Sequence, residues 1–176
     1  MEYFLFDFII KENNYYCIAY LNDKDGFVIK TEHLKTFYSV KEAVNYCEDN
    51  HIFLEDEEVC YCDVNVILNW LKKVSKESID CDQILSFWNT IGDVAFSIKE
   101  HFYGDENGTD NEILYVYNQL FYGTNPKALR GEDGEMYYPK WDEEDIQIIK
   151  NVVKDGLRIL SKALNIDLMK QLESEK

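Results

Sequence analysis

The sequence contains few prolines, few basic residues and no long apolar run. Two prolines in 176 residues leave little room for a stiff linker, and we find neither repeats nor low-complexity segments. No apolar stretch approaches the roughly 18 residues that a membrane-spanning helix needs. The first ten residues, MEYFLFDFII, contain two acids but no basic group and no small-residue cleavage site, unlike a secretory signal. We therefore expect one globular domain over residues 1–176, frayed at 168–176, in the cytoplasm.

The cysteines do not form the patterns that staple a fold or hold a metal. Five is an odd number, and the spacing does not suggest a disulfide framework, so reduced thiols are expected. Cys60 and Cys62 would project from one face of a strand and could hold zinc, but no further ligand has a recognisable spacing. The segment DENGTDNE (105–112) lacks the alternating oxygen ligands of a calcium loop. We predict no metal and no cofactor.

Catalytic motifs are also absent from the sequence. It has no glycine-rich phosphate loop, no HExxH or CxxC, and no nucleophile marked by a local pattern. A triad assembled in space stays open, because such triads have no fixed sequence order. We predict that the protein is not an enzyme, with a small hydrolase built from dispersed residues as the alternative.

Acidic residues dominate the charge. Thirty-four acids against eighteen bases give a net charge of −16, which repels nucleic acid and anionic membranes and favours a neutral or basic partner. The surplus is uneven, because residues 1–58 contain thirteen acids and five bases, and residues 100–145 contain twelve and three. Acidity that serves only solubility, on a binding or scaffold module of unknown partner, is the alternative interpretation.

The periodicity predicts an α+β fold in which a short N-terminal antiparallel sheet is followed by a mainly helical part packed on it. Aromatic and β-branched runs predict strands over 3–10 and 14–21, and a third strand follows the turn NDKDG (22–26). EDEE (55–58) predicts a loop, with room for one more strand beside it. Apolar residues at helical spacing predict helices over 40–50, 64–75, 83–102, 111–123 and 142–166.

Helix-start chemistry accounts for many of the acids. Ser39 with Glu42 forms a capping box, and a side-chain oxygen can also cap the four later helices, from Asp63, Asp80 or Asp82, Asp110 and Asp142. Gly123 is expected to end its helix in a left-handed conformation. Gly92, inside a helix, predicts the close approach of a neighbouring element, at a cost of about 1 kcal/mol relative to alanine.

The stretch RGEDGEMYYPKWDEEDI (130–146) contains more acids than a helix start requires. The stretch overlaps the second part of a connection of about seventeen residues, TNPKALRGEDGEMYYPK (124–140). Loops of that length are usually functional or include short strands, and GEDGE could be the tip of a hairpin. Helix capping does not explain the loop residues, and tyrosines are common anchors at interfaces. We therefore predict a partner-binding surface at Glu132, Asp133, Glu135, Tyr137 and Tyr138. The alternative is that the two tyrosines pack under the loop.

A second acidic run, at residues 105–112, lies at the start of the helix predicted over 111–123, whereas the loop carboxylates at 132–135 follow the end of that helix. We include its carboxylates in the predicted surface, on the geometric expectation that both runs lie near one helix; they are Asp105, Glu106, Asp110 and Glu112.

Four stretches together resemble the immunity proteins that protect bacteria from contact-dependent or polymorphic toxins. They are YSVKEAVNYCEDNHIFLEDE (38–57), ILSFWNTIGDVAFSI (84–98), NQLFYGTNP (118–126) and YYPKWDEEDIQIIKNVVKDGL (137–157). The resemblance implies a cognate toxin domain, often a nuclease, that is produced with this protein and held inactive by it. It also implies a monomer, or a 1:1 heterodimer with the toxin. It supplies no residue-level binding motif.

Overall fold

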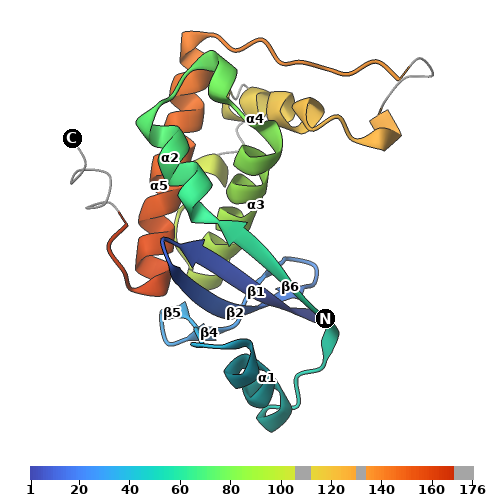
Figure 1. Ribbon diagram of the computed structural model, residues 1–176, viewed down its shortest axis with the longest axis vertical. Coiled ribbons are helices and arrows are strands. Elements are labelled where there is room, and N and C mark those ends of the chain that lie inside the picture. The colour runs from blue at the N-terminus through green and yellow to red at the C-terminus, as the bar shows by residue number, and fades with distance from the viewer. Residues whose placement is uncertain (106–111, 130–133, 169–176) are drawn as a thin grey trace.

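The chain begins with an antiparallel meander, as its sequence predicts. This computed structural model describes residues 1–105, 112–129 and 134–168. β1 (Glu2–Ile10) pairs antiparallel with β2 (Asn13–Leu21), which pairs antiparallel with β3 (Gly26–Phe27). β6 (Leu54–Asp63) pairs parallel with β1, so the sheet is mixed rather than antiparallel, in the order β3-β2-β1-β6 (Figure 1). The predicted α+β class is confirmed.

The third strand is shorter than its sequence suggests. After β3, the chain forms β4 (Ile29–Lys30) and β5 (His33–Leu34), which pair with each other in a separate two-stranded sheet. Thr31 has φ 62°, in the left-handed region, and this residue turns the chain between the two short strands.

The acidic run EDEE (55–58), predicted as a loop with room for a strand beside it, forms an irregular part of the strand β6. Along β1, Tyr3 pairs with Leu54 but Leu5 pairs with Val59, so residues 55–58 stand opposite a single β1 residue. The run therefore bulges from the edge of the sheet while the strand continues on both sides of it. Such bulges at a sheet edge, with charged side chains, discourage pairing with another chain.

Helices cover both faces of the sheet. α1 lies on one face, and α2, α3 and α5 lie on the other, with α4 packed against α3 and α5 (Figure 1). Cys17 and Ile18, neighbours on β2, are buried in opposite layers, as the alternation of a strand requires. The helices are α1 (Val40–Asp49), α2 (Val64–Lys72), α3 (Cys81–Ile98), α4 (Glu112–Gly123) and α5 (Glu143–Leu164), with short 3-10 turns η1 (Lys76–Ser78), η2 (Tyr103–Asp105) and η3 (Lys127–Leu129).

The helix starts largely follow the predicted capping. Asp63, Asp80 and Asp142 each accept a hydrogen bond from a backbone N–H of the first turn of α2, α3 and α5. Ser39 accepts from the Glu42 N–H at 3.2 Å, but the Glu42 carboxylate accepts from the Tyr38 N–H at 3.0 Å, one residue before the box. The cap predicted at Asp110 lies outside the described residues.

The prediction that Gly123 ends its helix in a left-handed conformation is wrong. Gly123 is the last residue of α4, and the left-handed residue is Asn125, with φ 52°. The glycine is required for packing instead, because a Cβ at this position would lie 2.4 Å from the Cys81 Sγ and 2.8 Å from the Pro139 Cγ.

Other predictions about the second half of the chain are modified. Residues 134–142 contain no strand, so no hairpin forms in the described part of the long connection. Of the tail predicted to fray, Leu168 is fully buried and its N–H donates to the Ser161 Oγ at 3.2 Å, while 169–176 lie outside the described residues. Among the described residues, no helix combines the length and the apolar character needed to cross a membrane.

α3 crosses α5 at a glycine. A Cβ at Gly156 of α5 would lie 2.8 Å from the Cε1 of the buried Phe87 ring on α3 and 3.3 Å from the Cγ1 of Ile91. The two helices therefore approach as closely as they do because Gly156 has no side chain. Gly92 of α3 is different, because a Cβ there would meet only the Asp105 Oδ1, at an ordinary 3.5 Å.

Two glycine-to-alanine substitutions should therefore have opposite effects. Gly92→Ala should raise the free energy of unfolding by about 0.5–1 kcal/mol, the helix propensity of alanine over glycine. Gly156→Ala should lower it by about 1 kcal/mol, because overpacking against Phe87 outweighs the same gain in propensity. Urea unfolding at neutral pH measures both. Stabilisation by both substitutions would contradict the close crossing.

Candidate functional site

An arm projects from the helical part of the molecule. We define the arm as α4 with residues 124–129 and 134–142; it runs out from α3 and returns to the start of α5 (Figure 1). Asn125 joins the outgoing segment 124–129 to the returning segment 134–142. The Asn125 Nδ2 donates to the Tyr137 carbonyl oxygen at 2.9 Å, and the Tyr137 N–H donates to the Asn125 Oδ1. The side chain thus replaces a missing backbone ladder and fixes the backbone at Tyr137.

Large apolar side chains gather on the outside of this arm. Seven of them, with exposed fractions between 39% and 73%, form what we call the arm surface: Leu114, Tyr115, Phe121, Tyr122, Met136, Tyr137 and Tyr138. The Tyr122 ring lies edge-on to both Phe121 and Tyr137, with centroids 5.8 and 6.1 Å apart, and the Tyr137 hydroxyl donates to the Gln119 Oε1. Several large exposed apolar groups on one projecting segment are typical of interaction sites.

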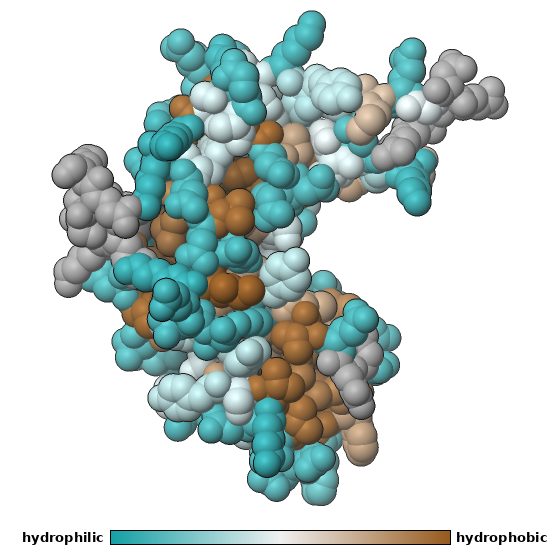
Figure 2. Space-filling model, viewed as in Figure 1, coloured by the Kyte–Doolittle hydropathy of each residue, from teal (hydrophilic) through white to brown (hydrophobic). Residues whose placement is uncertain are grey.

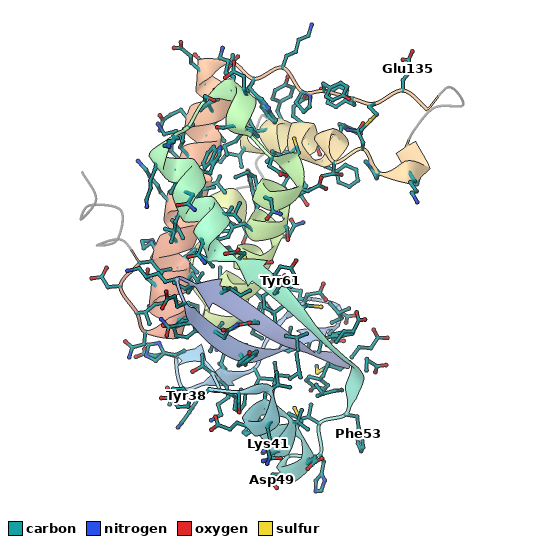
Figure 3. The ribbon with its side chains drawn as sticks, viewed as in Figure 1. Tyr38, Lys41, Asp49, Phe53, Tyr61 and Glu135 are labelled. Carbon is teal, nitrogen blue, oxygen red and sulfur yellow. The ribbon has the colours of Figure 1, made fainter. Side chains whose placement is uncertain are left out.

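The structure places the predicted partner-binding residues at two ends of α4. Tyr137 and Tyr138 do not pack in the core: Tyr138 is 73% exposed, and Tyr137 rests against the second half of α4. Glu135 is exposed near the tip of the arm (Figure 3). Glu112 is exposed as the first residue of α4, and Asp105 lies beyond it, in the cleft described next. The remaining predicted residues, Glu106, Asp110, Glu132 and Asp133, lie outside the described part.

A cleft lies between the base of the arm and the sheet. It has a volume of about 730 Å³ and is walled by α3, α4, η2 and the turn between β2 and β3. Figure 2 shows the molecule hollowed between the arm and the sheet. The lining residues include Lys24, Asp25, Trp88, Asn89, Asp93, Phe96, Asp105, Ile113, Leu114 and Tyr117. A smaller apolar cavity of about 230 Å³, lined in part by Phe4, Phe6 and Cys60, shares Asp25 and Asp93 with it.

The turn with Lys24 and Asp25 is fixed over α3 by hydrogen bonds. The Phe27 N–H of β3 donates to the Ser97 Oγ at 2.7 Å, and the Ser97 hydroxyl donates in turn to the Asp93 carbonyl oxygen at 2.7 Å. The Asp25 carboxylate accepts from the Asn22 N–H at 3.1 Å, which closes the turn.

The segment with Asp105 is fixed from the other side, by α5. The Tyr103 N–H donates to the Asp155 carboxylate at 2.9 Å, and Arg158 binds both Asp155 and the Glu100 carboxylate. Gly104 is needed here because its Cβ would lie 2.6 Å from the Trp88 Nε1, and its carbonyl accepts from that indole N–H at 3.2 Å.

Burial and mutual repulsion perturb the carboxylates of the cleft. Burial, followed by the charges of Asp25 and Asp105, raises the pKa of Asp93 from 3.8 to about 6. Burial also raises the pKa of Asp105, against the opposing charges of His101 and Lys24. The Lys24 Nζ lies 5.1 Å from the centroid of the Phe96 ring, over its face. The cleft therefore combines excess negative charge with aromatic walls, an environment that attracts cations.

Sequence reasoning identified Asp105 but missed the rest of the cleft. Asp93 is an acid within an otherwise apolar stretch of α3, next to Gly92. This was the available sequence signal for a carboxylate in the cleft. The neighbour of Gly92 is Asp105, but a Cβ at Gly92 would make only an ordinary contact with the Asp105 Oδ1, at 3.5 Å, so the predicted close approach is absent at this residue. The sequence has no feature that joins a turn at residues 22–25 to a helix seventy residues later.

The described residues do not assemble a metal site. No group of three or more histidine, cysteine, aspartate or glutamate side chains in this part of the chain is arranged to hold a metal ion. All five cysteines are free thiols. Cys60 and Cys62 both lie on β6; Cys60 is exposed beside the apolar cavity, and Cys62 is buried in the core.

Comparisons with known proteins do not assign the chain to a family. No protein family matches its sequence, and no curated protein matches it either. One solved structure, the C-terminal domain of SatS in complex with bromine, is similar over 94% of each chain, with 10% sequence identity and a TM-score of 0.49.

Removing the Asn125 clamp should loosen the arm. Asn125→Gly keeps a residue that tolerates the left-handed backbone but deletes both hydrogen bonds to Tyr137. We expect the free energy of unfolding to fall by about 1–2 kcal/mol and the Tyr137 amide to exchange with deuterium faster. Thr124→Gly, next to the clamp but outside the helix, is the control. Unchanged exchange at Tyr137 in Asn125→Gly would exclude the clamp.

Neutralising Asp93 should stabilise the fold in a pH-dependent manner. Because its folded pKa lies above the unfolded value, the ionised group destabilises the folded state above about pH 6, and this penalty is lost as the pH falls toward 3.8. Asp25, Asp105 and Lys24 line the same cleft as Asp93.

We therefore expect Asp93→Asn to raise the free energy of unfolding by about 1 kcal/mol at pH 7.5. A shift of about two pKa units corresponds to roughly 3 kcal/mol, and solvent screening at this half-exposed site reduces it. The gain should disappear near pH 4. Urea unfolding at several pH values measures it, with Glu12→Gln in the exposed β1–β2 turn as control. A gain that does not change with pH would contradict the perturbed carboxylate.

Proposed function

We propose that this protein is an immunity protein that binds and neutralises a basic toxin domain, a nuclease by preference, in the cytoplasm. It would act by binding and not by catalysis, as a monomer that forms a 1:1 complex. The observation on which this depends is the arm surface, where Tyr137 and Tyr138 are exposed on the same arm as Glu135, on a chain of net charge −16 (Figure 3).

The charge favours a basic partner. A nuclease binds phosphate through lysine and arginine, so its substrate groove is itself basic. An acidic protein can occupy the same groove, and complementary fields accelerate the encounter to about 10⁸–10⁹ M⁻¹s⁻¹ at low salt. The acidity therefore has a use beyond solubility.

The arm supplies what charge alone does not. Binding energy at interfaces is concentrated in a few large side chains, often tyrosine, that lose contact with water. Tyr137 is held in place by Asn125, Gln119 and Tyr122, so little conformational freedom is lost when it binds. Tyr138, 73% exposed, is the more available of the two rings.

Co-expression is the decisive experiment. The gene directly upstream should encode a large secreted protein with a toxic C-terminal domain, and that domain should arrest growth when it is produced alone. Production of this chain together with the domain should restore growth, and the two should purify as a 1:1 complex. Absence of such a domain, or growth arrest that persists with both proteins present, would leave a binding module of some other kind.

The arm is tested with two matched tyrosines. In the complex, Tyr138→Ala should weaken binding at least tenfold, about 1.4 kcal/mol, because it removes an exposed anchor without disturbing the core. Tyr38→Ala should change affinity less than twofold; Tyr38 is 94% exposed but lies beside α1, far from the arm (Figure 3). Titration calorimetry measures both. Equal losses, or no loss at Tyr138, would remove the arm from the interface.

A further inference from the structure

We propose that the cleft between α3, α4 and the β2–β3 turn is a pocket for one arginine side chain of the toxin domain. This deepens the proposed function and rests on it for the identity of the partner. The pocket would select the partner, whereas the arm surface would provide contact area beside it.

Size is the first argument. Binding pockets in proteins have volumes of about 300–1,000 Å³, and the cleft, at about 730 Å³, lies within this range. A long side chain together with its flanking backbone can enter such a space. The adjoining apolar cavity, lined by Phe4 and Phe6, would accept an apolar neighbour of that side chain.

Charge is the second argument. Three carboxylates from three separate elements face the cleft, Asp25 from the turn, Asp93 from α3 and Asp105 from η2, against the single ammonium of Lys24. A guanidinium has five N–H donors in a plane and can bind carboxylates on different sides at once, which an ammonium does less well. The excess of negative charge thus fits arginine better than a neutral ligand.

The aromatic walls are a third argument, independent of the acids. The Lys24 ammonium already lies 5.1 Å above the Phe96 ring, so this wall holds a cation within the folded chain itself. Trp88 and Tyr117, whose rings are edge-on at 5.5 Å, form a further aromatic wall. Guanidinium groups stack on such faces, and partial desolvation in a cleft strengthens the attraction.

The position of the cleft connects it to the arm. Ile113, Leu114 and Tyr117 of α4 line the cleft, and the same helix carries Phe121 and Tyr122 of the arm surface. Leu114 belongs to both. A protein that docks on the arm surface is therefore adjacent to the cleft, and one projecting side chain can enter it.

The test uses small probes, so it does not require the toxin. The indole N–H of Trp88 reports on the cleft in a ¹⁵N-correlated NMR spectrum, and the indoles of Trp70 and Trp141, which do not line the cleft, are internal references. Acetyl-arginine amide should shift the Trp88 signal with millimolar affinity. The neutral isostere Nα-acetyl-citrulline amide should bind at least tenfold more weakly. Nα-acetyl-lysine amide, which keeps its side-chain ammonium, should bind severalfold more weakly.

Variants with opposite effects distinguish a pocket from general attraction to an acidic protein. Asp93→Asn should weaken binding of acetyl-arginine amide at least fivefold, whereas Asp49→Asn on α1, remote from the cleft, should leave it unchanged (Figure 3). Lys24→Gln should strengthen binding two- to fivefold, because it removes the competing internal ammonium.

Several outcomes would overturn the proposal. They are equal binding of arginine and citrulline amides, tighter binding of lysine than of arginine, shifts of all three indoles together, or equal losses in Asp93→Asn and Asp49→Asn. If the co-expression experiment fails but the titration is positive, the cation-binding pocket is retained and the toxin is removed as its partner. The reverse result would retain the partner and remove the pocket.

Discussion

The packing of α3 between the sheet, α4 and α5 is the constraint on which the remaining structure depends. Phe87 meets Gly156 of α5, Ser97 receives the Phe27 N–H of the sheet, and Trp88 lies edge-on to Tyr117 of α4. These contacts come from different sides of one helix. Because α3 is held from all of these sides, it fixes the positions of the β2–β3 turn and of α4. The cleft is the space that remains between that turn and that helix.

The acidic residues divide into those whose charge the fold uses and those whose charge it leaves unopposed. Asp63, Asp80 and Asp142 satisfy helix N-termini, and Glu100 binds both Arg158 and Lys162. The cleft is the contrasting case, where burial and like charges disfavour ionisation of Asp93. Ionised Asp93 lowers the stability of the folded protein, because it is partly buried and lies near two other carboxylates. Destabilising groups of this kind are more typical of binding sites than of the rest of the surface.

Local patterns predicted the elements better than their connections. Periodicity gave the five helices and the meander, and capping chemistry gave most helix starts, because both depend on neighbours in sequence. The parallel pairing of β6 with β1 was not predictable, since it depends on how the chain returns after α1. Asn125 was also missed, because the reason for its left-handed backbone is a partner twelve residues away. The candidate site followed the same division: Tyr137, Tyr138 and Glu135 were predicted from a local excess of acids and tyrosines, whereas Asp25 and Asp93 meet only in three dimensions.

The arm and the cleft would contribute to recognition in different ways. The arm surface offers apolar area on rings already ordered by Asn125 and Tyr122, so its contribution is affinity and tolerates variation in the partner. The cleft presents carboxylates from three elements at fixed positions, and a partner without a cation at the matching position would leave them desolvated and unpaired. Such a penalty would discriminate against wrong partners, which contact area alone does less selectively because it is favourable for many partners. In the proposed complex, the rigid placement of α3 would therefore be a requirement for selectivity, while the net charge of −16 would act on the rate of encounter.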